Sequence, residues 1–291
     1  MSASMRSPIF YAQHFLQDSC LVASLVKQSS ISRQDTVYEI GPGRGIITEQ
    51  LAWHARQVVA IEKDPRLAVM LRKRFACMPG VTIHAGDFLD YPLPRQPYKV
   101  FANIPFNITS AIVNKLTTAA LPPEEASLIM QKEAAEMFLG QPRESLRTIL
   151  LKPWFEVEMV HTFKRRDFLP APRVDVVMLR LRKRGPPLIK SGERQRFRDF
   201  VVHLFTTWQP RQPATLCGVF TRQQLNAVER ELSIDVRASP AALSPQEWLK
   251  LFEYFARAGS EQARQRIAGS EQRLLQQQQS LQKRHRTRTP G

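Results

Sequence analysis

The tetrapeptide Asn103-Ile104-Pro105-Phe106 contains residue types that could activate an exocyclic amine of a nucleobase. Such an amine is a weak nucleophile because its lone pair is delocalised into the ring. The side-chain oxygen of Asn103 and the backbone carbonyl of Ile104 or Pro105 could each accept one N–H hydrogen, which would direct the lone pair at an electrophilic methyl group. Pro105 makes the turn rigid, and Phe106 could stack on the base. Taken alone, these residues are more often an ordinary proline turn beside an aromatic ring.

A glycine-rich loop, Gly41-Pro42-Gly43-Arg44-Gly45, could hold a nucleoside. Glycines let a ligand lie against main-chain N–H groups without interference from a Cβ atom. The spacing G-x-G-x-G differs from the G-x-G-x-x-G of dinucleotide sites, which disfavours a nicotinamide oxidoreductase. Glu62 ends the next expected strand, where a carboxylate can accept hydrogen bonds from a ribose diol. For the loop alone, a plain turn between strand and helix is the simpler alternative.

A third motif, Gly86-Asp87-Phe88, follows the next expected strand. Asp87 could accept a hydrogen bond from an adenine amine, and Phe88 offers an apolar wall. A single Asp after a strand is usually a turn former. Because open α/β sheets bind ligands at the carboxyl ends of their strands, the motifs in this order predict one nucleoside site.

The elements that must position these residues lie within 36–184, where short β-branched runs alternate with segments of helical period. This pattern predicts a parallel sheet with crossover helices. The last two runs are joined by a loop too short for a crossover helix, which predicts an antiparallel pair. Asp18 or Ser19 could cap a helix near 21–26, and Thr109 another. The expected strands are 36–40, 58–62, 81–84, 100–103, 127–130, 154–161 and 174–181, and the expected helices between the early strands are 46–55, 66–76 and 110–119.

Three parts are expected along the chain. Residues 1–184 hold the predicted sheet and the motifs, and residues 185–258, with apolar stripes at 197–205 and 248–252, form a small helical domain. In the tail, 259–291, Gly259-Ser260-Glu261-Gln262 recurs as Gly269-Ser270-Glu271-Gln272 before a glutamine run and a basic end. Its apolar content is too small for a core, so we expect a disordered, basic Gln/Arg-rich segment.

Composition narrows the class of protein. The chain has 291 residues with 42 Lys+Arg and 26 Asp+Glu, a net charge of +16 that favours a polyanionic partner over a merely solvated basic face. Its 3 cysteines are far apart, which predicts neither a disulfide framework nor a metal site and indicates a reducing, cytoplasmic setting. No run approaches the ~18 apolar residues that span a bilayer, and the N-terminus lacks an apolar signal core, so no membrane association is expected.

The motifs, in this order, resemble those of the rRNA adenine N6-methyltransferases. That family includes the erythromycin-resistance (Erm) enzymes, which act on large-subunit rRNA, and the small-subunit rRNA dimethyladenosine transferases. Residues 220–225 and 244–254 are more similar to the Erm branch. The resemblance covers about residues 9–258 and rests on Tyr11-Ala12-Gln13-His14-Phe15-Leu16, Glu39 to Gly45, Ala60-Ile61-Glu62, Gly86-Asp87-Phe88, Asn103 to Ile108 and Phe168 to Asp175.

The resemblance implies an α/β fold, with a Rossmann-like methyltransferase sheet that is mostly parallel, an antiparallel strand near its end and a small C-terminal helical domain. It implies S-adenosyl-L-methionine as the methyl donor, bound by a catalytic domain of residues 1–184, and RNA binding by the small helical domain of residues 185–258. Four positions depart from the family pattern: Ala12 replaces a common Gly, His14 a common Asn, Phe106 a frequent Tyr and Val176 a frequent Ser. The residues implied to bind the cofactor are His14, Leu16, Gly41, Gly43, Glu62, Asp87 and Asn103; those implied to be catalytic are Asn103, Ile104, Pro105 and Phe106; those implied to sandwich the target base are Phe106 and Phe168.

The Erm resemblance further implies a monomer that methylates a single-stranded adenine beside a structured hairpin of 23S rRNA and confers resistance to macrolide, lincosamide and streptogramin B antibiotics. A small-subunit dimethyltransferase remains an alternative, as does a non-catalytic RNA-binding or transcription-factor relative, against which the intact Asn103–Phe106 turn argues. The sequence leaves open the number of methyl groups added, free rRNA or a precursor particle as substrate, the role of the tail, and which Lys and Arg contact phosphates.

Overall fold

The computed structural model describes residues 14–286, so Tyr11, Ala12 and Gln13 of the first motif lie outside the described residues. Within the described residues the chain forms two compact units: the residues up to 135 with 157–183, and residues 136–156 with those from 184 onward. Sequence analysis placed 136–156 in the first domain. It belongs to the second because Ile149 is buried in the core of the helical unit, with Trp154 packed against it.

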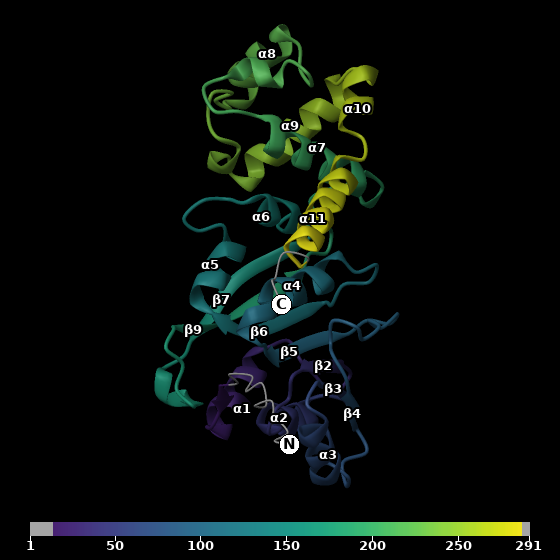
Figure 1. Ribbon diagram of the computed structural model, residues 1–291, viewed down its shortest axis with the longest axis vertical. Coiled ribbons are helices and arrows are strands. Elements are labelled where there is room, and N and C mark those ends of the chain that lie inside the picture. Colours follow the sequence, from purple (N-terminus) through teal and green to yellow (C-terminus); the bar gives the residue numbers. More distant parts are fainter. Residues whose placement is uncertain (1–13, 287–291) are drawn as a thin grey trace, which may run out of the picture. The chain divides into compact units, whose positions relative to one another are not determined.

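The first unit contains a seven-stranded sheet in the order β4-β3-β2-β5-β6-β9-β7 (Figure 1). Strands β4, β3, β2, β5 and β6 are parallel, and β9 runs antiparallel to β6. This matches the expected mostly parallel sheet. A separate pair, β1 (Phe15–Leu16) and β8 (Phe168–Leu169), is antiparallel. The seven strands are β2 (Thr36–Ile40), β3 (Gln57–Glu62), β4 (Val81–Ala85), β5 (Lys99–Asn103), β6 (Glu125–Gln131), β7 (Phe155–Thr162) and β9 (Val176–Lys183).

The strand order reverses between β2 and β5. From β2 the chain proceeds through β3 to β4 on one side, and from β5 to β6 on the other. At such a switch point the loops after the two central strands diverge and leave a crevice. Gly41 follows β2 and Asn103 ends β5, so the topology brings the glycine loop and the Asn103 turn together.

The helices of the first unit bury one apolar side against the sheet. Asp18 caps α1 by accepting hydrogen bonds from the N–H groups of Cys20 and Leu21. Of the two predicted candidates, Asp18 and Ser19, Asp18 is therefore the cap. Thr109 does not cap α4. It is the first helical residue, and its hydroxyl donates to the Phe106 carbonyl at 3.1 Å. The helices are α1 (Ser19–Gln28), α2 (Ile46–His54), α3 (Pro65–Arg74), α4 (Thr109–Thr118) and α5 (Lys132–Leu139), the last running into the second unit.

The second unit is helical, as the apolar stripes predicted. Its core is aromatic, with the ring centroids of Phe200 and Phe255 4.9 Å apart and Trp248 buried beside them. Aromatic side chains bury large apolar areas, which suits a small unit. Its helices are α6 (Leu146–Leu151), α7 (Arg194–Thr207), α8 (Arg222–Leu232), α9 (Pro245–Ala258), α10 (Glu261–Ile267) and α11 (Ser270–Arg286).

The prediction of a disordered tail is wrong for residues 261–286, which form α10 and α11. The Ser260 hydroxyl caps α10 by accepting from the Ala263 N–H at 3.1 Å. Ala263 and Ile267 are buried in the aromatic core of the second unit. Composition averaged over the tail hid these two apolar residues, which lie four apart and therefore on one side of a helix.

This packing predicts that Ile267→Ala lowers the free energy of unfolding of the second unit by about 2–4 kcal/mol, the usual cost of emptying a buried Ile site. Leu275→Ala is the matched control, because Leu275 is 50% exposed on α11 and should change stability by less than about 0.5 kcal/mol. Urea unfolding followed by tryptophan emission measures both, since Trp208 and Trp248 are buried in this unit. Equal midpoints for the two variants would show that α10 does not pack in solution.

Candidate active site

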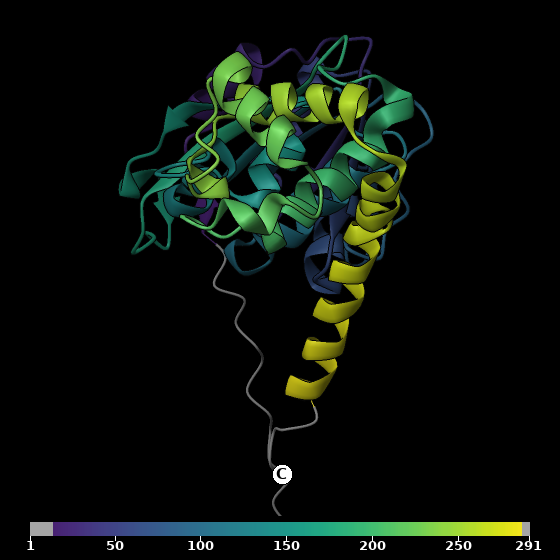
Figure 2. The same cartoon turned by 90° about the horizontal axis from the view of Figure 1, so that it is seen from above.

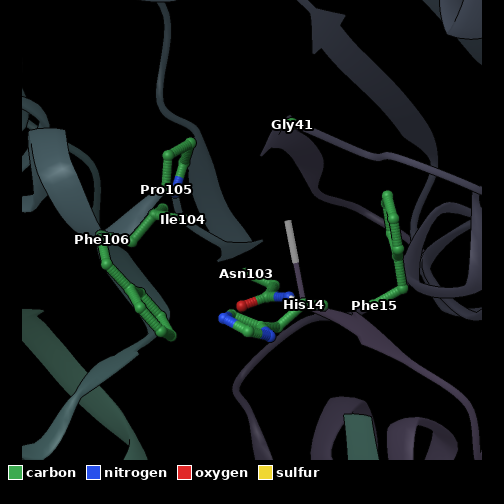
Figure 3. Close-up of a pocket in the computed structure, with 7 residues that line it drawn as sticks. All are labelled: His14, Phe15, Gly41, Asn103, Ile104, Pro105 and Phe106. Carbon is green, nitrogen blue, oxygen red and sulfur yellow. Dashed lines mark hydrogen bonds between the residues drawn. The ribbon is translucent and has the colours of Figure 1, made fainter. Parts of the chain in front are cut away.

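Seven residues surround a small cavity of about 50 Å³ at the switch point (Figure 3). They come from three segments: the first strand of the small pair, the glycine loop and the turn after β5. The cavity-lining residues are His14, Phe15, Gly41, Asn103, Ile104, Pro105 and Phe106.

Gly41 gives the cavity an open side. Its φ is +66°, a conformation that glycine adopts readily, and its N–H donates to the Ile61 carbonyl at 2.9 Å. A Cβ atom added here would have no neighbour within 4 Å. The backbone at Gly41 is therefore open, and a ligand could lie directly against it.

Phe15 covers the next glycine of the loop. A Cβ atom on Gly43 would lie 2.6 Å from Cε1 of Phe15, so only glycine fits beneath the ring. The Arg44 guanidinium lies over the same ring, 5.1 Å from its centroid. Sequence analysis gave Phe15 no role, and the signal that could have found it is its place between two residues assigned to the cofactor, His14 and Leu16.

The Glu62 carboxylate fixes the glycine loop through hydrogen bonds from backbone N–H groups. It is 1% exposed, and its two carboxylate oxygens accept from the N–H groups of Gly43 at 3.0 Å and Asp64 at 2.8 Å. Burial raises the pKa of Glu62 above its usual value, against the opposing effect of these backbone hydrogen bonds. Glu62 does not line the cavity, so its contacts with the loop are the role that the structure shows.

Glu39, at the end of β2, is a buried carboxyl group with one unsatisfied oxygen. Oε2 accepts from the Thr48 hydroxyl at 2.6 Å, while Oε1 has no hydrogen-bond partner among the described residues. Burial, together with repulsion from Glu62, raises the pKa of Glu39 to about 8. Glu39 is therefore protonated at neutral pH.

Asn103 is oriented by a contact with the N-terminal segment. Its Nδ2 donates to the His14 carbonyl at 2.7 Å. Because the amide nitrogen is used there, Oδ1 faces the other way, toward the side of the cavity where Phe106 lies (Figure 3). A flipped amide would direct a donor into the cavity, and this hydrogen bond opposes that flip.

His14 connects three parts of the site. Its Nδ1 bonds to the Pro170 carbonyl at 2.7 Å, which requires the proton on Nδ1, and its ring stacks on Phe106 with centroids 5.7 Å apart. The adjacent pairing of Phe15 with Leu169 holds the segment beside β8. Placement of Asn103 therefore depends on a strand pair whose members are more than 150 residues apart.

The turn after β5 distinguishes between the two predicted backbone acceptors. The Pro105 carbonyl accepts from the Ile108 N–H at 3.2 Å, and the Thr109 hydroxyl lies 3.5 Å from it. The Ile104 N–H is held by the Ile129 carbonyl at 3.1 Å on the neighbouring strand. Of the two carbonyls, that of Pro105 is engaged within the turn.

Asp87 is paired with a lysine. Its Oδ2 lies 2.7 Å from Lys63 Nζ, and its Oδ1 accepts from the Leu89 N–H at 2.9 Å. The hydrogen bond from Lys63 holds the pKa of Asp87 below its usual value. Phe88 is buried, with Lys115 Nζ 5.3 Å from its ring centroid. Neither Asp87 nor Phe88 lines the cavity.

Phe168 differs most from its predicted place. Its side chain is 2% exposed and packs in the core of the first unit, tilted against Phe163 with centroids 5.3 Å apart. Six of the predicted site residues line the cavity: His14, Gly41, Asn103, Ile104, Pro105 and Phe106; the others, Leu16, Gly43, Glu62, Asp87 and Phe168, do not.

The residues lining the cavity include no Lys, Arg, Asp or Glu. Across the described part of the chain, no cluster of three His, Cys, Asp or Glu residues could hold a metal ion. Over the same residues, no helix is long and apolar enough to cross a membrane.

Comparison with known proteins connects this site to a family. The family model of the ribosomal RNA adenine dimethylases matches residues 5–257. An rRNA adenine N-6-methyltransferase of Saccharopolyspora erythraea is 34% identical over 244 residues, which are 84% of this chain and 64% of that protein, so the chain spans just under two thirds of that relative. The crystal structure of the 23S rRNA methyltransferase ErmE is similar with a TM-score of 0.76 and 34% identity, covering 83% of this chain and 99% of the solved one.

A relative of another branch matches a shorter part of the chain. A probable ribosomal RNA small subunit methyltransferase A of Methanopyrus kandleri is 37% identical over 172 residues, 58% of this chain and 61% of that protein. The crystal structure of a dimethyladenosine transferase from Plasmodium falciparum is similar with a TM-score of 0.70 and 24% identity, and it covers 84% of this chain and 98% of the solved one.

The buried carboxyl of Glu39 predicts a pH-dependent stability. The folded chain keeps a proton that the unfolded chain releases near pH 4.5, so Glu39 stabilises the fold most below that pH, and the contribution is lost as pH rises to about 8. Glu39→Gln should therefore gain stability over the wild type as pH rises from 5 to 8.5, by on the order of 2–4 kcal/mol. Melting temperatures across this range test it, with Glu133→Gln, an exposed residue of the same unit, as control. A constant difference between Glu39→Gln and wild type would show that Glu39 ionises normally.

Proposed function

The chain belongs to the ribosomal RNA adenine dimethylase family and is an rRNA adenine N6-methyltransferase, and on this premise we propose that it transfers a methyl group from S-adenosyl-L-methionine to N6 of one adenine of 23S rRNA. The observation that carries the proposal is the orientation of Asn103. Its amide nitrogen is bound to the His14 carbonyl, so its oxygen is available as an acceptor in the cavity. A target amine needs such an acceptor and gains nothing from a donor.

The residues of the site fit the methyl donor. The open backbone at Gly41 offers a surface for a nucleoside. Glu39 Oε1, which has no hydrogen-bond partner among the described residues, lies at the end of the strand that leads into the loop. When bound, S-adenosyl-L-methionine supplies an electrophilic methyl group on a positively charged sulfur. No cationic side chain lines the cavity, so none of its lining residues would repel that charge.

Asn103 and Ile104 activate the amine. The Asn103 oxygen accepts one N6 hydrogen, and the Ile104 carbonyl accepts the other because the Pro105 carbonyl is engaged by Ile108. Together the two acceptors would direct the N6 lone pair at the methyl group that a bound donor would supply, with the donor's sulfur as the leaving group. The methylated nitrogen is cationic and acidic, and it loses one hydrogen as a proton to water. Alignment of this kind can contribute about 7–11 kcal/mol to catalysis, without a protein nucleophile or metal.

Phe106 and His14 bind the target base. Phe168 is buried, so the ring opposite Phe106 is that of His14. The two rings now stack on each other with centroids 5.7 Å apart. A base needs about 3.5 Å of contact with each ring, so the rings must move apart as the base enters. Removing the base from its stack costs a few kcal/mol, which stacking partly returns.

The sequence identity supports 23S rRNA over small-subunit rRNA. ErmE is 34% identical over 83% of the chain, whereas the dimethyladenosine transferase that covers 84% of it is 24% identical. The chain works as a monomer in the cytoplasm on an adenine exposed beside a hairpin, and the modification confers resistance to macrolide, lincosamide and streptogramin B antibiotics. Leu16, Gly43, Glu62 and Asp87 shape or contact the cofactor site from outside the cavity.

The function is tested by expressing the chain in a susceptible bacterium and mapping methylated adenines in both rRNAs by mass spectrometry. We expect N6-methylation at one 23S position together with resistance to the three drug classes. Asn103→Ala is the control and should abolish both, because it removes the acceptor, while the folded protein still binds RNA. Modification of 16S rRNA alone would establish the small-subunit alternative, and full activity of Asn103→Ala would contradict the mechanism.

The two rings predict distinct kinetic effects. Phe106→Ala and His14→Ala should each lower kcat about 10-fold or more, since stacking contributes roughly 1–3 kcal/mol per base, and should leave the phosphate-dominated Kd for RNA within about 2-fold. His14→Phe retains a ring but loses the bond to Pro170, so it should recover part of the activity. Phe168→Leu, in the core, should affect stability more than kcat. A larger effect on kcat at Phe168 than at His14 would instead support the pairing of Phe106 with Phe168 around the target base.

A further inference from the structure

The C-terminal segment beyond the family match is built into the second unit. The family model ends at residue 257, one residue before the end of α9. Helices α10 and α11 follow, and neither has a part in the site described above. Although the segment lies outside the family match, its packing in the core of the second unit holds it in place.

Asp199 fixes the start of α11. This residue of α7 is 6% exposed, and its carboxylate oxygens accept from the N–H groups of Gly269 at 3.0 Å and Glu271 at 2.9 Å. The first N–H groups of a helix have no partner within the helix, and a carboxylate there also interacts favourably with the helix dipole. The cap comes from a residue about 70 positions earlier, so it orients α11 relative to α7.

A second contact fixes the same turn. Arg198 Nε donates to both carboxylate oxygens of Glu271, at 2.8 and 2.9 Å, and its guanidinium also donates through Nη2. Gln195 Nε2 adds a hydrogen bond at 3.2 Å. Although burial opposes ionisation, Arg198 holds the pKa of Glu271 below its usual value. We call Asp199, Arg198, Gln195 and Glu271 the α11 clamp.

Beyond the clamp, α11 leaves the other helices of its unit. Figure 2 shows its last turns extending past α7–α10, and residues 275–278 are exposed. The helix has 17 residues, so its end lies roughly 20 Å from the clamp at a rise of 1.5 Å per residue. The helix is fixed at its first turn by the contacts above, and its last turns project as an arm.

The charge of this arm has one sign. After Glu271 the sequence contains no Asp or Glu and five basic residues, Arg273, Lys283, Arg284, Arg286 and Arg288. Arg273 donates to the Ala268 carbonyl at 2.8 Å and belongs to the turn. The other four are concentrated in the sequence at 283–288, and the last of them, Arg288, lies outside the described residues. A basic end with so little apolar surface suits a polyanion better than a membrane, which requires an apolar helical face.

We propose that α11 is an RNA-binding arm, held in a set direction by the α11 clamp, whose basic end contacts phosphates of the substrate RNA. The inference rests on the proposed function for the identity of that RNA. The arm contributes affinity and not chemistry, since the acceptor atoms all lie in the first unit. The clamp reduces the entropy lost on binding by ordering the helix in advance.

The first test compares the full chain with a chain that ends at Gln278. The shortened chain keeps the clamp and lacks the four basic residues at 283–288. We expect its Kd for a 23S rRNA fragment to rise about 10-fold at 150 mM salt, and the slope of log K against log salt to fall by about 3, since four phosphate contacts are lost. Single-turnover methylation at saturating RNA should be unchanged. An unchanged salt slope, or a change in oligomeric state on truncation, would overturn the proposal.

The second test separates a clamped arm from a loose basic tail. Glu271→Gln in the full chain removes the ion pair and one negative charge, which raises the net charge by one, so a loose tail predicts equal or tighter binding. The clamped arm predicts weaker binding, by about 3-fold or more. Glu253→Gln, at an exposed position of α9, makes the same charge change without touching the clamp and should not weaken binding. Unchanged tryptophan emission shows that Glu271→Gln is folded.

The outcomes also separate the arm from the proposed function. If the full chain binds RNA with the expected salt slope but transfers no methyl group, the proposed function fails and the arm is supported. If methylation proceeds and both variants bind like the full chain at every salt concentration, the arm is refuted and the proposed function stands.

Discussion

The site depends on one hydrogen bond between segments far apart in the sequence, from the Asn103 amide nitrogen to the His14 carbonyl. It decides which atom of Asn103 faces the cavity, and so whether the turn after β5 offers an acceptor or a donor to a substrate. His14 is in turn held by Pro170 and by the pairing of β1 with β8. The acceptor is therefore preorganised by backbone contacts, which cost no rearrangement during the reaction.

The sheet supplies the second constraint. Its strand order reverses between β2 and β5, so the glycine loop and the Asn103 turn diverge at the same edge and leave a crevice. Two buried carboxyl groups support that edge: Glu62 holds the loop through its N–H groups, and Glu39 remains largely protonated. Burying such groups is costly, and proteins tolerate the cost mainly where a site requires it.

The second unit shows how a polar segment becomes structured without a large apolar surface. Ala263 and Ile267 place α10 in an aromatic core, and Asp199 and Arg198 satisfy the start of α11. The contacts of Asp199 and Arg198 with the start of α11 join residues that are about 70 positions apart in the chain. The result is a basic helix whose direction is set by buried polar contacts, in a family whose shared part ends at α9.

The sequence by itself determined what local pattern encodes: the periodicity of strands and helices, the glycine loop, the cap at Asp18, and the motif order that identified the family. Gly41, Asn103 and Phe106 could be assigned to one site because parallel strands end at one edge. Other features depended on contacts between distant residues. Burial removed Phe168 from the cavity, the pairing of β1 with β8 brought His14 opposite Phe106, and Ile108 engaged the Pro105 carbonyl. The tail was misjudged because its partners, Asp199 and Arg198, lie about 70 residues away. Only the tertiary structure decides such matters, because a hydrogen bond or a buried face is completed by atoms that the local sequence does not contain.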